Sequence, residues 1–501
     1  MENKYLEIYQ KAKERLNALN YALYLISWDS ETEAPLGSLD EKTKQIGKLV
    51  EMQLEISHQP TYIEALRELA KTKDTLDEVT YLSVKKDLEN LEKELKIPED
   101  ELINYEMLLA KANSIWLEAK RSNDYNQFKP VLEQIINWEK KYIHYLETEN
   151  VKGYDVLLDD YEKGFTQKDY DAFFDTLKKE LVPFVKQIIK ETPINDDFNK
   201  KYYAIDKQKK YAAYLSKVMC FNPLYGVVKE SEHPFTSGYG TTDLRVTCHY
   251  YPHLLTSSIF SMIHELGHAT YERQCNTIFD DTPLSGGVTL AMHESQSRFY
   301  ENIVGRSYPF WQKHYPKLQQ TFKKELKDVS LDDFYHAVNK VENSLIRTEA
   351  DELTYPLHIM ARYDIEKAIF NNQVSIDELP KLWNQLYKAY LEIDVPSDTE
   401  GILQDVHWAG GSFGYFPTYA LGSAYAAQLY HQMKQEIDVD KAFGSETLAE
   451  VHQWLKEKVH QYAGSKTPKE ILLLATHEAF NPKYYIEYLK EKYTRIYNLK
   501  K

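Results

Sequence analysis

Cysteine is scarce in this sequence, with three residues in a chain of 501. Cys220, Cys248 and Cys275 form no Cys-x-x-Cys pair, and they are too few and too scattered for a disulfide framework or a cysteine-rich zinc site. The sequence also lacks an apolar run long enough to cross a bilayer, and residues 1–20 lack the apolar segment of a secretory signal. These absences predict a cytoplasmic protein that stays in a reducing compartment.

Positive charge is also in short supply. Lysine and arginine number 61 against 77 acidic residues, which gives a formal net charge of −16 at pH 7. A protein of this charge repels phosphate backbones and anionic lipid, so we expect neither a nucleic-acid partner nor a membrane partner. Hydrophobic residues still make up 43% of the chain, which is enough to bury a sizeable core.

Linkers rich in glycine, serine or proline are missing, as are repeats of fixed period, so residues 1–501 are predicted to form a single domain. Apolar residues recur three and four positions apart through most of the chain, and this spacing indicates amphipathic helices. Capping signatures predict helix starts where Ser38 precedes Glu41 and where Thr166 precedes Asp169. The predicted fold class is therefore mainly α.

Two stretches break the helical pattern. In residues 231–252, apolar and polar side chains alternate from Leu244 to Tyr250. This alternation predicts a strand with Arg245 on its polar face, and such a strand could pair with an extended peptide. Residues 401–423 form a second irregular region, rich in glycines, aromatic residues and polar groups. We expect the chemistry of the protein in these two regions and in the helix between them.

That helix is predicted for "SSIFSMIHELGHATYERQ", in which His264 and His268 stand four residues apart. Side chains at this spacing share one face of a helix about 6 Å apart, so both imidazoles can bind one metal ion. Glu265 then lies beside the metal, where a metalloprotease needs its general base. The alternative is a chance match on a packed amphipathic helix. Gly267 argues against chance, because glycine weakens a helix by about 1 kcal/mol and indicates a packing or access requirement.

A catalytic zinc ion usually has three protein ligands and one open position, so a third ligand is expected. The stretch "GGVTLAMHESQSRFYENIV" is predicted to form a second helix, and it offers His293, Glu294 and Glu301. Glu294 stands four residues before Arg298, which can orient it, and a carboxylate completes a ligand set of two histidines and one glutamate. His293 is the competing candidate for the third ligand.

Six short motifs follow one another along the chain. They are HPF at residues 233–235, DLRVT at 243–247, HELGH at 264–268, HESQ at 293–296, IRTEAD at 346–351 and GILQDVHW at 401–408. In this order they resemble the motifs of the carboxypeptidase Taq family. Members of this family are metallocarboxypeptidases of the HExxH gluzincin type. The early WDSET at residues 28–32 also resembles the amino-terminal pattern of the family. The resemblance covers most of the chain.

The resemblance implies one large helical domain cut by a deep substrate groove, with a small strand region beside the metal site. It puts the amino-terminal helices, about residues 1–150, over the groove. The metal site falls in residues 230–300 and the substrate-binding motifs fall in residues 340–425. It also implies a homodimer that removes single residues from peptides with a free C-terminus.

Residue by residue, the resemblance makes His264, His268 and Glu294 the ligands of one divalent metal ion. It makes Glu265 the general acid and base. Nitrogen and oxygen ligands of this kind accept several divalent ions, so zinc is expected, with cobalt as the alternative.

An exopeptidase must also recognise a free carboxylate, which a planar guanidinium does with paired hydrogen bonds. Together with the resemblance, this need favours Arg347, with Arg245 as the competing carboxylate reader and His233 as a further substrate contact. The alternative for Arg347 is an exposed salt bridge to Asp351, four residues further along a predicted helix. The alternative for His233 is a role in a turn before Pro234.

A phenol or imidazole near the metal can donate a hydrogen bond to a developing oxyanion. On the resemblance, His407 and Tyr419 are the preferred donors, and Tyr415 is the alternative. The ordinary role of such a residue is packing, because the chain contains 40 tyrosines.

Two rival functions share part of this pattern. An oligoendopeptidase on a similar helical scaffold would use the same metal chemistry without a carboxylate anchor, so blocking the substrate C-terminus separates the two. A non-catalytic peptide-binding protein would have no use for a base at Glu265. The sequence therefore predicts a metal-dependent carboxypeptidase.

Overall fold

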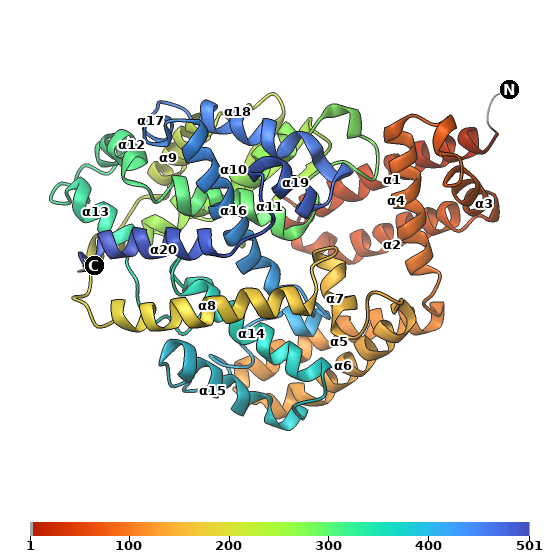
Figure 1. The fold of residues 1–501 in the computed structure, drawn as a ribbon, viewed down its shortest axis with the longest axis horizontal. Coiled ribbons are helices and arrows are strands. Elements are labelled where there is room, and N and C mark those ends of the chain that lie inside the picture. Colours follow the sequence, from red (N-terminus) through yellow and green to blue (C-terminus); the bar gives the residue numbers. More distant parts are fainter. Residues whose placement is uncertain (1–3, 500–501) are drawn as a thin grey trace.

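Helices make up nearly all of the regular structure of the protein (Figure 1). The computed structural model describes residues 4–499. Within this range the chain forms twenty α-helices, several short helical turns and one three-stranded sheet. The mainly α fold class predicted from the apolar spacing is confirmed. None of the described helices is both long enough and apolar enough to cross a membrane.

The first four helices form a group of their own. They are α1 (Lys4–Thr32), α2 (Leu39–Ser57), α3 (Pro60–Leu69) and α4 (Glu78–Glu94), drawn in red and orange in Figure 1. A hydrophobic cluster separate from the main core joins α1, α3 and α4, with Tyr62, Leu66 and Val84 among its buried residues, and α2 packs against α1. The Tyr24 hydroxyl of α1 donates to the Asp243 carbonyl oxygen at 3.1 Å and helps attach this group to the rest of the molecule.

The next two helices belong to the main body. α5 (Glu99–Ser122) and α6 (Tyr125–Leu146) pack against each other, and their buried residues, such as Phe128 and Leu132, are part of the main hydrophobic cluster. The amino-terminal helices, about residues 1–150, were predicted to cover the substrate groove. They therefore comprise two parts with different hydrophobic cores, α1 to α4 and α5 to α6.

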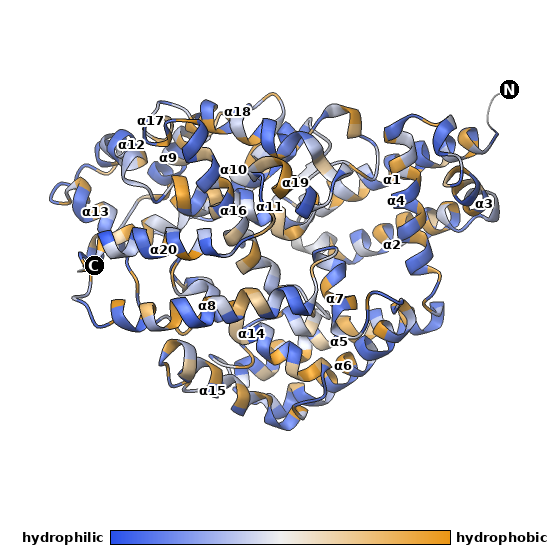
Figure 2. Ribbon diagram, viewed as in Figure 1, coloured by the Kyte–Doolittle hydropathy of each residue, from blue (hydrophilic) through white to orange (hydrophobic). Residues whose placement is uncertain are grey.

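The remaining helices complete the main body. They are α7 (Tyr154–Tyr161), α8 (Gln167–Ile188), α9 (Ile205–Val218), α10 (Leu255–Gln274), α11 (Leu290–Arg298), α12 (Tyr308–Thr321), α13 (Leu331–Val338), α14 (Tyr355–Phe370), α15 (Leu379–Leu391), α16 (Phe416–Glu436), α17 (Val439–Phe443), α18 (Ala449–Lys458), α19 (Pro468–Thr476) and α20 (Lys483–Ile496). Figure 2 shows hydrophobic and hydrophilic residues mixed along most helices, as expected where one face is buried. By contrast, α14 and α16 are buried over most of their length.

The two predicted capping signatures have different outcomes. Thr166 caps α8 and forms the reciprocal hydrogen bonds with Asp169, so this prediction is confirmed. Ser38 does not cap α2 with its side chain, and its hydroxyl donates to the Pro35 carbonyl oxygen at 2.7 Å. The physical reason is that Ser38 ends a short helical turn and has helical backbone angles, whereas a capping serine needs an extended backbone.

The sheet contains β1 (Gly226–Glu230), β2 (Thr236–Tyr239) and β3 (Asp243–Cys248) in the order β1-β3-β2. β3 runs parallel to β1 and antiparallel to β2, with Val246 opposite Val228 and Thr236. The strand predicted from residue alternation is confirmed, and its apolar side chains are buried. The expectation that it pairs with a peptide is wrong, because both edges of β3 are already hydrogen-bonded. β1 and β2 are the edge strands instead.

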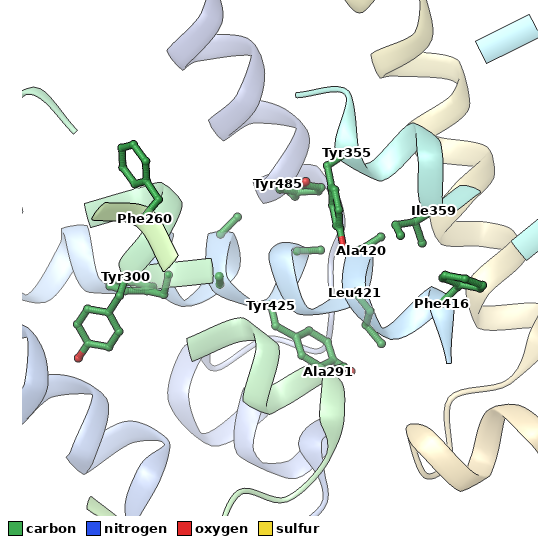
Figure 3. Close-up of a cluster of buried hydrophobic side chains, with 14 of the residues drawn as sticks. Phe260, Ala291, Tyr300, Tyr355, Ile359, Phe416, Ala420, Leu421, Tyr425 and Tyr485 are labelled. Carbon is green, nitrogen blue, oxygen red and sulfur yellow. The ribbon is translucent and has the colours of Figure 1, made fainter. Parts of the chain in front are cut away.

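Close helix packing fixes the position of α11. Figure 3 shows Ala291 of α11 near Leu421 and Tyr425 of α16, inside a cluster of buried side chains. A Cβ atom added at Gly422 would lie 2.8 Å from the Ala291 carbonyl oxygen, and one added at Gly267 of α10 would lie 2.9 Å from Ser297 Cα. The packing requirement inferred for Gly267 is therefore confirmed, and α11 is held closely between α10 and α16.

Candidate metal centre

Helices α10 and α11 bring the three predicted metal ligands together. Glu294 Oε2 lies 3.7 Å from His264 Nε2 and 3.7 Å from His268 Nε2. One ligand atom from each of the three residues lies within 4.8 Å of the others. Ligands around a tetrahedral ion with bonds of 2.0–2.1 Å are about 3.4 Å apart, so this set fits one ion. The two histidine side chains are 18% and 19% exposed, so both can be reached from solvent.

Each histidine has a hydrogen-bond partner on its other ring nitrogen. His264 Nδ1 lies 2.9 Å from Glu301 Oε2. His268 Nδ1 lies 2.6 Å from His293 Nδ1, and His293 Nε2 lies 2.6 Å from Glu272 Oε1. Partners of this kind set the tautomer that leaves Nε2 free to bind a metal.

His293 therefore does not compete with Glu294 for the third ligand position, since both of its ring nitrogens are engaged. It links His268 to Glu272. Sequence reasoning missed this relay and gave no role to Glu272. The available signal was its position four residues after His268, on the same helix face.

Arg298 orients the carboxylates of this centre, as the sequence predicted for Glu294. Its Nε donates to Glu294 Oε1 at 2.7 Å, and its Nη1 donates to Glu301 Oε2 at 3.1 Å. Burial opposes ionisation of Glu301, but Arg298 and the bonded His264 hold the pKa of Glu301 below its usual range. Glu301 lies in a π-helical turn, Phe299–Val304, that continues α11, and such turns are frequent at functional sites.

Glu265 is 7% exposed and lies beside the ligands on α10. The Thr236 hydroxyl of β2 donates to Glu265 Oε2 at 2.7 Å. Burial raises the pKa of Glu265 above its ordinary value, against the lowering effects of His264 and of the Thr236 hydrogen bond. Sequence reasoning missed Thr236, because nothing in the local sequence indicates that β2 lies against α10.

Arg347 has different surroundings from those expected. It begins a short 3-10 turn, Arg347–Glu349, and no α-helix carries it together with Asp351. The alternative considered for Arg347, a salt bridge to Asp351, is wrong: Asp351 accepts instead from the Thr354 hydroxyl at 2.8 Å. The turn leaves Arg347 buried, with Nε and Nη2 donating to Asp405 Oδ1 at 3.0 and 2.9 Å.

Asp405 bridges two arginines. Its second oxygen accepts from Arg362 Nε at 2.6 Å, and Arg362 is fully buried. Burial opposes ionisation of Asp405, but the two guanidinium groups hold its pKa below the usual range. Asp405 and Arg362 were not predicted from the sequence, although Asp405 is part of the GILQDVHW motif.

The predicted donors His407, Tyr415 and Tyr419 gather near Arg347. His407 Nε2 lies 3.5 Å from the Tyr419 hydroxyl, and the rings of Tyr415 and Tyr419 are 5.2 Å apart. Arg347 Cζ lies 5.3 Å from the centre of the Tyr419 ring. Burial, followed by the charge of Arg347, lowers the pKa of His407 to about 4. Burial raises the pKa of both tyrosines, and the charge of Glu294 adds to this effect.

The other two candidates for substrate contact have different positions. Arg245 donates from Nε and Nη2 to Asp243 at 2.8 and 2.9 Å, and its guanidinium lies over the ring of Tyr24 in α1. His233 is exposed, and its backbone carbonyl accepts from the Ser231 hydroxyl. Among the described residues, no hydrogen bond, ion pair or ring contact joins the His233 imidazole to the metal ligands.

A cavity of about 320 Å³ adjoins the metal centre. Thr236 and Tyr239 of the edge strand β2 line it on one side, and Glu272 and His293 line it on another. Asn17 of α1 forms part of its opposite wall. The cavity therefore lies where the amino-terminal helices meet the metal-binding helices.

The sequence and the fold both match known proteins. A family model described as carboxypeptidase Taq (M32) metallopeptidase matches residues 8–493. The chain is 41% identical to carboxypeptidase 1 of Bacillus subtilis (strain 168) over 502 residues, covering 99% of this chain and 100% of that protein.

Two solved structures are similar over nearly their whole length. A carboxypeptidase from Pyrococcus furiosus has a TM-score of 0.94 at 32% identity, covering 98% of this chain and 99% of that one. An M32 carboxypeptidase from Deinococcus radiodurans R1 has a TM-score of 0.95 at 29% identity, covering 98% of this chain and 100% of that one. The resemblance found in the six motifs is confirmed, and the chain belongs to the carboxypeptidase Taq (M32) family of metallopeptidases.

Proposed function

We propose that the protein is a metal-dependent carboxypeptidase that releases single residues from the C-termini of peptides. The observation that carries this proposal is the convergence of His264, His268 and Glu294, with Glu265 buried beside them. These three ligands would hold one divalent ion, for which zinc is the proposed identity and cobalt the alternative. Such an ion supplies Lewis acidity, which polarises the peptide carbonyl and makes water a stronger nucleophile.

Glu265 is the proposed general acid and base. Its Oε2 accepts from Thr236, which leaves Oε1 to take a proton from the attacking water. The same oxygen then delivers the proton to the nitrogen of the departing amino acid. The raised pKa of the buried carboxyl supports this exchange, because a base with a very low pKa releases a proton easily but accepts one poorly.

Arg347 is the proposed reader of the free C-terminus. A guanidinium has five N–H groups, and Asp405 and Tyr355 accept hydrogen bonds from three of them. Two N–H groups remain to bind a substrate carboxylate. Asp405 and Tyr355 hold the plane of the guanidinium in place. The burial of this guanidinium strengthens a charged hydrogen bond relative to the same contact in water.

Tyr419 and His407 are the proposed donors to the oxyanion, with Tyr415 as the alternative. Both phenols keep their protons at neutral pH because burial raises their pKa, so each can donate a hydrogen bond. Arg245 and His233 are assigned secondary parts in substrate binding. The unpaired edge of β2 offers backbone groups to an extended peptide beside Thr236.

Hydrolysis of one peptide with a free C-terminus and with an amidated C-terminus tests the function. Release of single C-terminal residues from the free peptide, with little cleavage of the amide and loss of activity on chelation, is the expected result. Internal cleavage of both peptides at similar rates would favour the oligoendopeptidase. Peptide binding without any hydrolysis by metal-loaded protein would favour the binding protein.

We further propose that the protein acts in the cytoplasm as a homodimer. The scarcity of cysteine supports the first statement, and the family resemblance supports the second. Light scattering on the eluting protein tests the assembly. A monomeric mass at all working concentrations would contradict it.

A further inference from the structure

A second cavity lies behind α10, on the side away from the metal ligands. Its volume is about 560 Å³, within the range of small-molecule sites. Thr270 and Arg273 of α10 line it, together with residues 219–222, Tyr225 and part of α18. Arg273 follows His264 by nine positions on α10. Nine residues make about two and a half helical turns, so the two side chains lie on opposite faces of the helix.

The lining of this cavity is free of acidic residues. Arg273 and Lys456 supply positive charge, and no aspartate or glutamate accompanies them among the described residues that line it. This is unusual in a chain with 77 acidic and 61 basic residues. By comparison, a different large cavity beside α20 is lined by lysines and arginines but also by Glu487 and Glu491.

Arg273 differs from the other arginines that are at least partly buried. Those arginines each bond a carboxylate, and they are Arg245, Arg298, Arg306, Arg347 and Arg362. Within residues 4–499 no carboxylate lies within ion-pair distance of Arg273, and its guanidinium stacks on the Tyr225 ring at 4.1 Å. Stacking holds the fork in place while leaving its N–H groups available for an anion.

His452 supplies a second unsatisfied group in the same lining. It is 6% exposed, and its Nε2 has no hydrogen-bond partner among the described residues. That nitrogen is itself buried, so the rest of the ring is the part that faces the cavity. Burial lowers the pKa of His452 to about 4, so the ring is neutral at pH 7 and can donate from one nitrogen.

We propose that this cavity binds a small phosphomonoester. The proposed peptidase reaction does not require such a ligand. A phosphate group at neutral pH carries up to two negative charges, which match Arg273 and Lys456, and it has oxygens for the His452 imidazole as well. Phe221 and Tyr225 give the cavity an apolar wall for the organic part of the ligand. The site needs neither the metal nor Glu265.

Calorimetric titration of the metal-loaded protein with phenyl phosphate tests the proposal. We expect saturable binding that Arg273→Gln weakens by about ten- to a hundredfold and Lys456→Gln weakens severalfold. Lys434→Gln is the matched control, because Lys434 is an exposed lysine stacked on Tyr430 beside the other cavity, and it should change nothing. Benzoate, with one charge fewer, should bind about tenfold more weakly or worse.

The exposed thiol of Cys220 gives an independent measure of where the ligand binds. Cys220 lines this cavity, whereas Cys248 is buried elsewhere and Cys275 is buried in the cavity wall. Saturating phenyl phosphate should slow alkylation of Cys220 severalfold. Binding that survives Arg273→Gln, an equal loss in Lys434→Gln, equal affinity for benzoate, or unprotected Cys220 at saturation would each overturn the proposal.

Discussion

At the scale of single residues, the two histidines proposed as metal ligands are linked to a carboxylate in different ways. His264 bonds Glu301 directly, whereas His268 reaches Glu272 through His293. Both routes leave Nε2 as the free nitrogen facing Glu294. Such outer partners orient a ligand and tune its basicity, and changing one typically costs about ten- to a hundredfold in metal affinity or activity.

The role of Glu265 is separable from that of its neighbours. Glu265→Gln keeps the shape of the side chain and an oxygen for Thr236, but an amide cannot take up the proton. We expect turnover to fall by about a hundred- to ten-thousandfold while the metal content stays the same. Elemental analysis and kcat on one peptide measure the two effects. His268→Ala, the control, should lose metal and activity together, and an active Glu265→Gln would place the base elsewhere.

Arg347 is best tested by a change that keeps its charge. Arg347→Lys retains a cation beside Asp405 but removes the planar fork that a carboxylate pairs with. We expect kcat/KM for free peptides to fall about tenfold or more, with a smaller effect on amidated peptides. The preference of the enzyme for free over amidated C-termini should therefore decrease. Arg245→Lys on β3 is the matched control. If this preference decreased in Arg245→Lys but not in Arg347→Lys, Arg245 on β3 would be the residue that binds the carboxylate.

At the scale of elements, the metal centre depends on how closely three helices approach. α11 carries Glu294 and is packed between α10 and α16, with glycines at both contacts. A side chain at either glycine would press on the backbone of α11. The position of Glu294, the proposed third ligand, therefore follows from helix packing as much as from the motif that contains it.

Gly422→Ala tests this dependence. The added methyl would lie 2.8 Å from the Ala291 carbonyl oxygen and 2.9 Å from Glu294 Cβ, so α11 and α16 must move apart. We expect a loss of about 1–3 kcal/mol in the free energy of unfolding, together with weaker metal binding. Thermal melting and a metal-competition titration measure both.

Gly47→Ala in α2 is the control, since an added Cβ there meets no atom within 4 Å. In the interior of a helix this exchange should stabilise the protein by about 0.5–1 kcal/mol and leave metal binding unchanged. A Gly422→Ala variant as stable as the parent and equally tight for metal would show that α11 adjusts without effect on the site.

At the scale of the whole molecule, three buried glutamates join different elements through hydrogen bonds from tyrosines. Glu139 of α6 accepts from Tyr105 of α5, Glu162 accepts from Tyr425 of α16, and Glu366 of α14 accepts from Tyr154 of α7. Burial raises the pKa of Glu139 to about 8 and that of the other two to about 7. In the folded protein these groups therefore bind protons at a pH where the unfolded chain has released them.

This difference sets the sign of the pH dependence. The stabilising contribution of such a group is complete below its unfolded pKa of about 4.3, and it is lost as pH rises toward the folded pKa. We expect the free energy of unfolding to fall between pH 6 and pH 8 by up to about 1.4 kcal/mol per pH unit for each group.

Glu139→Gln should remove the Glu139 share of this slope, because the amide still accepts from Tyr105 and does not titrate. Urea unfolding at several pH values measures the slope. Glu133→Gln on the exposed face of α6 is the matched control, and both variants keep the same metal site. An unchanged slope in Glu139→Gln would mean that Glu139 is already ionised in the folded protein at pH 6.

Local patterns in the sequence determined much of this protein. The apolar spacing gave the mainly α fold, the four-residue spacing gave His264 and His268, and Thr166 capped its helix as predicted. These features depend on residues a few positions apart, whose geometry is fixed once a helix forms. Glu294 could be named as a ligand candidate for the same reason, since Arg298 lies one turn away.

Only the tertiary structure decided which groups from distant segments meet. It engaged both nitrogens of His293, paired Arg347 with Asp405 instead of Asp351, and buried Glu265 against Thr236. It also put β3 in the middle of its sheet, where a peptide cannot pair with it. Contacts between segments tens of residues apart depend on packing and burial of the whole chain, and no local period in the sequence encodes them.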